Sequence, residues 1–248
     1  METLGQPELE NGLIGVHTAR GNLVKMAYRE GTSDLGTIGA TFRLWGKLED
    51  EYDLAGLPDD LTGTAIDIGA HIGTVALALL ADHPRLHVIA VEPLLGNVEM
   101  IARSAVENGF ADRLTVHLAG ISATDTASVD WNWRATTNEG YWRTNRFIGN
   151  VMVPKEGEYE MAHDTAVVPG VSLKSLLPKR GRVPFLKIDC EGCEWVALAD
   201  PAVKRIDVIA GEYHGHPGPD GLESMLGSTH VVTHTPEGAC GMFRAVIR

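Results

Sequence analysis

The sequence predicts an α/β fold in which a mostly parallel sheet carries helices on both faces. Three observations lead to this prediction. A short apolar run at residues 64–68 is followed by a glycine-punctuated turn and then by an apolar segment of helix length. Strand-length and helix-length apolar segments go on alternating as far as residue 119, which is typical of a parallel sheet. The chain has 248 residues, of which 44% are hydrophobic, so it is long enough for one such domain.

The first sixty residues are expected to form a layer ahead of the main sheet. Residues 1–16 are polar and glycine-containing, which predicts a loosely held arm. The Gly21-Asn22 pair separates two strand-like runs and predicts a hairpin. A weakly amphipathic segment at 38–45 predicts a helix. We therefore expect residues 1–60 to be an arm, a hairpin and a helix that cover the site, and residues 61–248 to be the main domain.

The alternating segments set out the elements of the main domain. Strands are expected at residues 64–68, 87–91, 114–119, 185–189 and 206–211, helices at 71–81, 95–108 and 194–198, and a closing hairpin from strands at 231–234 and 242–247. Ligands of parallel sheets bind at the carboxyl ends of the strands. Polar residues at these ends, among them Asp67, Glu92 and Asp189, would therefore lie along one edge.

The turn after the first main strand indicates an adenosine-type cofactor. Gly69 and Gly73 allow a tight turn whose backbone can touch a bound nucleotide. Glu92 ends the next strand, where a carboxylate can accept hydrogen bonds from ribose hydroxyls. Dinucleotide folds use G-x-G-x-x-G, but this chain has D-I-G-A-H-I-G, and Asp67 suits a cationic ligand better than a pyrophosphate. These features favour S-adenosylmethionine and disfavour a nicotinamide cofactor.

Three ordered motifs carry a family resemblance. They are I-D-I-G-A-H-I-G at residues 66–73, V-E-P at 91–93 and F-L-K-I-D-C-E-G at 185–192. Here the chain resembles the FkbM family of S-adenosylmethionine-dependent methyltransferases. The resemblance implies a Rossmann-like class I methyltransferase fold, with a mostly parallel seven-stranded sheet and an antiparallel C-terminal strand. The residues expected to bind the cofactor are Asp67, Gly69, Ala70, His71, Gly73, Glu92, Ser122 and Asp189.

Residues 123–171 interrupt the alternation and are too long for an ordinary connection. Three of the five tryptophans lie in this excursion. Long excursions are usually functional, so we expect a substrate lid. The alternative is that the aromatic residues pack a small added hairpin against the sheet. The residues expected to bind the methyl acceptor are Trp131, Trp133, Tyr141, Trp142 and Arg143.

The acceptor must lose a proton, and four candidate bases follow adjacent strands. Asp189 and Glu191 follow one strand, and Glu212 and His214 follow the next. His214 is the first candidate because its usual pKa lies near neutrality. The same four residues could instead hold a divalent metal that acidifies a hydroxyl. The family resemblance requires no metal, and we expect none.

Composition and charge limit the classes of partner that the protein is expected to bind and the compartment in which it is expected. A net charge of −12 disfavours nucleic acid and anionic membrane surfaces. The chain has no apolar run of membrane-spanning length and its start lacks the pattern of a signal peptide, so we expect a cytoplasmic protein. Its three cysteines suit a reducing compartment, and the C-x-x-C pair of Cys190 and Cys193 is expected to have no redox or metal role.

The function we expect is methyl transfer from S-adenosylmethionine to a hydroxyl of a small molecule. The family resemblance implies a sugar or a natural-product intermediate as the acceptor. N-methylation of an amino sugar is the first alternative, since an acidic protein suits a cationic substrate. A nicotinamide-dependent oxidoreductase is the alternative from another class. A homo-oligomer is compatible with all three.

Overall fold

The computed structural model describes residues 11–30, 32–44, 50–131, 164–237 and 240–248. Its main sheet has seven strands in the order β11-β12-β10-β9-β3-β4-β5. These strands are β3 (Gly63–Ile68), β4 (Leu86–Glu92), β5 (Leu114–Leu118), β9 (Val183–Ile188), β10 (Ile206–His214), β11 (His230–Glu237) and β12 (Cys240–Ile247). β12 runs antiparallel to both of its neighbours, and the other pairs are parallel. The expected class I methyltransferase architecture is confirmed.

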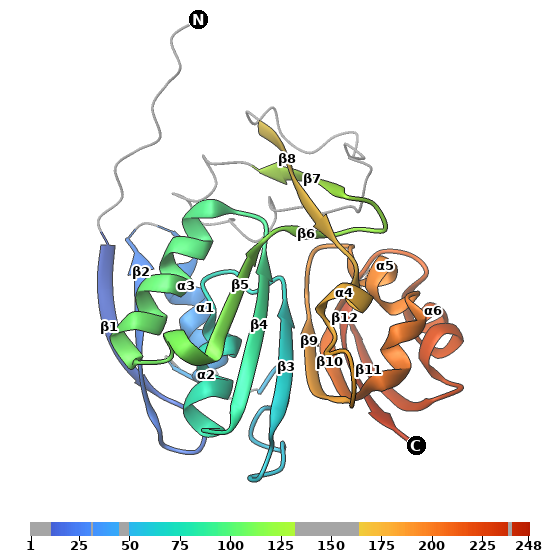
Figure 1. Cartoon of the computed structure of the whole chain (residues 1–248), viewed down its shortest axis with the longest axis horizontal. Helices are drawn as coiled ribbons and strands as arrows, with labels where there is room; N and C mark the ends of the chain where they lie inside the picture. The colour runs from blue at the N-terminus through green and yellow to red at the C-terminus, as the bar shows by residue number, and fades with distance from the viewer. Residues whose placement is uncertain (1–10, 31, 45–49, 132–163, 238–239) are drawn as a thin grey trace, which may run out of the picture.

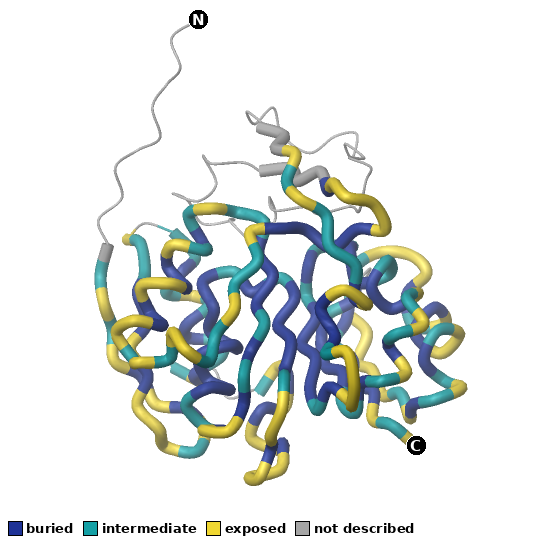
Figure 2. The backbone as a smooth tube through the Cα atoms, viewed as in Figure 1, coloured by how far each residue is buried: buried dark blue, intermediate teal, exposed yellow. Residues whose placement is uncertain are grey.

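The central strands are mostly apolar because both of their faces are covered. Ala65 and Phe185 belong to one hydrophobic cluster, while their chain neighbours Ile66 and Leu186 belong to a second. Successive side chains of a strand point to opposite faces, so the two clusters are the two sides of the sheet. Figure 2 shows these strands as a buried layer inside the molecule.

Each cluster is completed by its own set of helices (Figure 1). The first contains residues of α1 (Asp34–Thr41), α2 (Thr74–Asp82) and α3 (Leu95–Asn108). The second contains residues of α4 (Leu173–Leu176), α5 (Glu194–Leu198) and α6 (Gly218–Leu226), together with the 3₁₀ helix η4 (Pro201–Arg205). A further 3₁₀ helix, η1 (Ala111–Arg113), leads into β5. Helix α6 has no counterpart among the expected elements.

The N-terminal hairpin forms as expected but begins earlier. Strands β1 (Asn11–His17) and β2 (Leu23–Arg29) pair antiparallel around Gly21, whose φ is 84°. Part of the segment expected to be an arm is therefore strand, since β1 starts at Asn11. The hairpin packs on α3, where the Ala27 backbone N–H donates to Ser104 Oγ at 2.8 Å.

The long excursion is anchored at both of its ends by strands. β6 (Gly120–Ile121) pairs parallel with β8 (Asp164–Val171), and β7 (Thr126–Trp131) pairs antiparallel with β8. In Figure 1 these three strands lie above the main sheet, beyond the end of β5. Residues 132–163 lie outside the described residues. No helix in the described part of the chain is long and apolar enough to cross a membrane.

Candidate active site

A cavity of about 550 Å³ lies at the carboxyl ends of β3, β4, β9 and β10. One wall is the turn after β3 with the end of β4, and the opposite wall is acidic, with Asp189, Glu191 and Glu212. Helix α1 and its N-cap contribute a third wall through Ser33, Thr37 and Thr41, among other residues. Of the N-terminal elements, the helix rather than the hairpin is therefore next to the site.

The glycine turn needs glycine at its first position. Gly69 has φ 71°, and a Cβ there would lie 1.8 Å from the carbonyl oxygen of Asp189. The β3 turn and the β9 turn therefore approach each other with no room for a side chain. The backbone N–H groups of Gly69 and Ala70 both donate to the Val91 carbonyl, at 3.0 and 3.1 Å. This pairing ties the turn to the end of β4.

Glu92 is the last residue of β4 and lines the cavity while only 4% exposed. Its Oε1 accepts hydrogen bonds from Leu94 N and Asn97 Nδ2, and its Oε2 accepts one from His71 N at 2.8 Å. Burial raises the pKa of Glu92 to about 7, despite the lowering effect of these hydrogen bonds. A carboxylate has about four acceptor positions, so Glu92 can still accept hydrogen bonds from a ligand.

Asp67 is not among the described residues that line the cavity, and its expected contact with the cofactor stays a prediction. It is fully buried, and its Oδ2 accepts from Ala76 N in the first turn of α2 at 3.1 Å. Its Oδ1 lies 3.4 Å from Lys187 Nζ. A carboxylate at this position thus caps a helix and neutralises a buried lysine.

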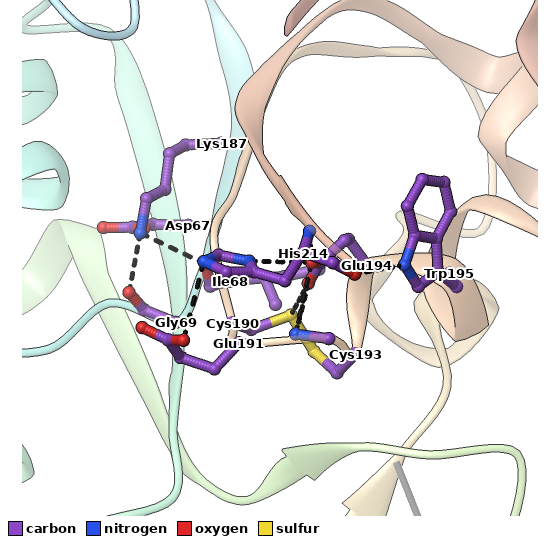
Figure 3. Close-up of a disulfide and its surroundings, with 11 residues drawn as sticks. Asp67, Ile68, Gly69, Lys187, Cys190, Glu191, Cys193, Glu194, Trp195 and His214 are labelled. Atoms are coloured by element: carbon purple, nitrogen blue, oxygen red, sulfur yellow. Dashed lines mark hydrogen bonds and ion pairs between the residues drawn. A yellow bond between two sulfur atoms is a disulfide. The ribbon is translucent and has the colours of Figure 1, made fainter. Parts of the chain in front are cut away.

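The sequence analysis did not single out Lys187, which is the charged partner of Asp67. Its Nζ donates to the carbonyl of Gly69 at 2.6 Å (Figure 3). The same Nζ lies over the ring of Tyr52. Burial lowers the pKa of Lys187, but the charges of Asp67 and Asp189 outweigh this effect and raise it. A lysine inside a buried strand was a usable signal, because buried charges are paired.

Three further cofactor candidates have distinct surroundings. Ala70 and His71 both line the cavity. Burial lowers the pKa of His71 to about 4, so its ring is neutral at pH 7. Ser122 is buried, and its Oγ accepts from the backbone N–H of Thr124 at 3.1 Å. Among the described residues, the segment 119–121 lines the cavity and Ser122 lies just beyond it.

The acidic wall is held in place by a tyrosine. Tyr52 Oη donates to Asp189 Oδ2 at 2.8 Å. Burial, with help from the charge of Asp189, raises the pKa of Glu191 to about 8 and that of Glu212 to about 7. Both carboxyl groups therefore change protonation near neutral pH. Ligand atoms of Asp189, Glu191 and His214 lie within 4.8 Å of one another, so this wall could also hold a metal ion.

His214 is placed differently from the expectation. It is behind Glu191 and Glu212 rather than among the described residues that line the cavity. Its Nδ1 lies 2.8 Å from Oε1 of Glu194, a fully buried residue. Burial lowers the pKa of His214, but the hydrogen bond to Glu194 and the charges of Glu191 and Glu194 outweigh this effect and raise it to about 10. An imidazolium cannot accept a proton, so the structure argues against His214 as the base.

Cys190 and Cys193 form a disulfide, whereas the cysteine number had favoured reduced thiols; the expectation that the pair has no redox or metal role stays a prediction. Both residues line the cavity beside Glu191. Figure 3 shows the bridge between Glu191 and Glu194.

The expected acceptor residues of the excursion are only partly within the described structure. Trp131 is the last residue of β7. Trp133, Tyr141, Trp142 and Arg143 lie outside the described residues. Their role stays a prediction.

Comparisons with known proteins agree with the fold. The family model of the methyltransferase FkbM domain matches residues 67–232. No curated protein matches the chain. Among solved structures, the 16S rRNA methyltransferase RsmC of T. thermophilus, in complex with AdoMet and guanosine, has a TM-score of 0.50 at 13% identity, over 100% of this chain and 53% of that one. The methyltransferase FkbM from Methylobacillus flagellatus has a TM-score of 0.49 at 16% identity, over 83% of this chain and 47% of that one. This chain thus spans about half the length of those two proteins.

Proposed function

This chain belongs to the FkbM methyltransferase domain family, and we propose that it methylates a hydroxyl group of a small molecule, a sugar or a natural-product intermediate. One observation carries the proposal. A single cavity joins the glycine turn and Glu92 on one side to three carboxyl groups that can titrate or pair with cations on the other. A cofactor half and an acceptor half are therefore adjacent, as an in-line transfer requires.

S-adenosylmethionine is the methyl donor of the proposed reaction. The free acceptor positions of Glu92 suit the two ribose hydroxyls, and the close backbone of Gly69 and Ala70 suits a flat, extended ligand. Neutral His71 adds no positive charge beside a sulfonium. Asp189, oriented by Tyr52, suits the cationic amino group of the cofactor. Asp67 acts indirectly, by holding Lys187 and the start of α2 beneath the turn.

When bound, the cofactor would supply an electrophilic methyl group for transfer to the acceptor oxygen. The acceptor hydroxyl must lose its proton in this reaction, and we propose that the carboxylate of Glu212 accepts it. Its carboxyl group lines the cavity and has a pKa of about 7, so it is partly ionised at neutral pH and can accept a proton there. Glu191 lines the same wall with a pKa of about 8 and is the second choice.

N-methylation of an amine is the second candidate function. The observation that favours it is the acidic wall, since Glu51, Asp189, Glu191 and Glu212 all line the cavity. These carboxylates would attract an ammonium group and repel a phosphate. For the same reason we propose a small-molecule acceptor rather than a nucleic acid, in keeping with the net charge of −12.

Two measurements test this function. Calorimetric titration should show binding of S-adenosylmethionine and none of NADH. A panel of hydroxylated and aminated sugars, incubated with methyl-labelled S-adenosylmethionine, should give labelled product, and mass spectrometry of the product distinguishes an O-methyl from an N-methyl group. Binding of NADH alone, or labelling confined to RNA substrates added to the panel, would reject the proposal.

A further inference from the structure

We propose that Arg29 is a positioning residue of the cofactor site: it fixes the amide of Asn97, which in turn holds Glu92 in place for the ribose of S-adenosylmethionine. This inference rests on the proposed function, in which Glu92 accepts hydrogen bonds from the ribose hydroxyls. It assigns a task to a residue of the N-terminal hairpin that is not among the described residues lining the cavity and that precedes the segment matched by the family model.

Arg29 is the last residue of β2, and this strand lies beside both α1 and α3 (Figure 1). Its Nε and Nη2 donate to the two carboxylate oxygens of Asp34 at 2.8 Å each, and its backbone N–H donates to Asp34 Oδ2 at 2.9 Å. Asp34 is the first residue of α1, and its side chain is 0% exposed. A forked pair with a fully buried carboxylate leaves the guanidinium little freedom to turn.

The same guanidinium reaches the start of α3. Arg29 Nη2 donates to Asn97 Oδ1 at 2.7 Å. Gly96 leaves room for this approach, because a Cβ there would lie 3.2 Å from Arg29 Nη1. An arginine only donates, so the amide oxygen of Asn97 must face it and the NH₂ group must point the other way. That NH₂ group donates to Glu92 Oε1 at 3.0 Å.

The orientation of the Asn97 amide decides how Glu92 is held. With the NH₂ group toward Glu92, Oε1 accepts from two donors, the other being Leu94 N at 3.1 Å. Oε2 accepts from His71 N and has a further acceptor position for a ribose hydroxyl. An amide turned over would place its oxygen against the carboxylate and repel it. Arg29 excludes that second orientation.

The partner of Arg29 also borders the second oxygen of Glu92. Asp34 Oδ1 lies 3.7 Å from His71 Nε2, and His71 supplies the backbone N–H that donates to Glu92 Oε2. The Arg29–Asp34 pair therefore contacts the residues that hold both oxygens of Glu92. In this way β2 and α1 together support a carboxylate at the end of a strand of the main sheet.

The Arg29→Lys variant tests this role, because lysine keeps the positive charge beside Asp34 but lacks the fork that contacts Asp34 and Asn97 together. Two ligands separate positioning from general stability: S-adenosylhomocysteine, the demethylated cofactor, and its 2′,3′-dideoxy analogue, which lacks both ribose hydroxyls. The variant should bind S-adenosylhomocysteine roughly tenfold more weakly, a loss of about one hydrogen bond, and the dideoxy analogue with wild-type affinity. Arg103→Lys, exposed on α3, is the matched control and should change neither affinity.

Asn97→Leu removes the amide and should lower the affinity for S-adenosylhomocysteine at least as much. The double variant should lose no more affinity than Asn97→Leu alone, because Arg29 acts through Asn97. Additive losses would show that Arg29 acts by another route and overturn the proposal. An Arg29→Lys variant that binds both ligands more weakly by the same factor would show a purely structural role and overturn it as well.

Calorimetry on the wild-type protein needs no variant to fold and no acceptor. It should show tighter binding of S-adenosylhomocysteine than of the dideoxy analogue. Equal affinities would overturn the proposal, because Glu92 would then not bind the ribose hydroxyls. The expected pattern of affinities in a protein that methylates none of the hydroxylated or aminated sugars would reject only the proposed function.

Discussion

Replacing Glu92 with glutamine should weaken S-adenosylmethionine binding through the loss of one specific oxygen. Oε1 already accepts two protein hydrogen bonds, from Leu94 N and Asn97 Nδ2, whereas Oε2 accepts only one, from His71 N. The amide oxygen of glutamine should therefore take the Oε1 position. Its NH₂ group then replaces Oε2, where a ribose hydroxyl would need an acceptor.

The size of the effect follows from the charge that is lost. A hydrogen bond to a charged group contributes about 1.5–3 kcal/mol, which corresponds to a roughly 10- to 150-fold higher Kd. The wild-type Kd should also depend on pH, because the pKa of Glu92 is about 7. The ionised form binds the ribose, so affinity is nearly full above about pH 8, falls to about half at pH 7 and to about one tenth at pH 6.

Isothermal titration calorimetry between pH 6 and pH 8.5 measures both effects. The difference between wild type and Glu92→Gln separates the titration of Glu92 from that of the ligand. Glu99→Gln is the matched control, because Glu99 is exposed on α3. A folded Glu92→Gln variant with wild-type affinity would remove Glu92 from the cofactor site.

Three further predictions address the turn, the buried ion pair and the excursion. Gly69→Ala should abolish S-adenosylmethionine binding or prevent folding, because its Cβ would lie 1.8 Å from a carbonyl oxygen. The control Gly109→Ala has a similar φ and open space around it, so it should lower the unfolding free energy by only about 1–2 kcal/mol. Equal effects of the two variants in urea unfolding would refute the close-approach argument. Lys187→Met should destabilise the fold by about 3–5 kcal/mol, because it leaves the buried Asp67 carboxylate without its cation. The control Lys179→Met changes an exposed lysine and should have no such effect. Equal melting temperatures for the two variants would contradict the prediction. Trp142→Ala should raise the acceptor KM and leave cofactor affinity alone, and a loss of cofactor binding would instead favour a packing role.

At the acidic wall, tertiary structure decides which of two residues that are close in the sequence can act as the base. Glu212 and His214 are two residues apart on β10 and were both candidate bases. Glu212 lines the cavity, but His214 is fixed by Glu194, which comes from the start of α5. Which of the two can accept a proton is thus set by a contact between separate elements.

The sequence by itself determined the fold and the position of the site. Hydrophobic periodicity and glycine placement are local properties, so the α/β order, the turn at Gly69 and the strand-end position of Glu92 could all be predicted. The tertiary structure decided what each charged group does. Asp67 and Lys187 neutralise each other across neighbouring strands, a pairing that depends on register. Protonation states likewise depend on burial and on charges from distant parts of the chain, which sequence spacing does not specify.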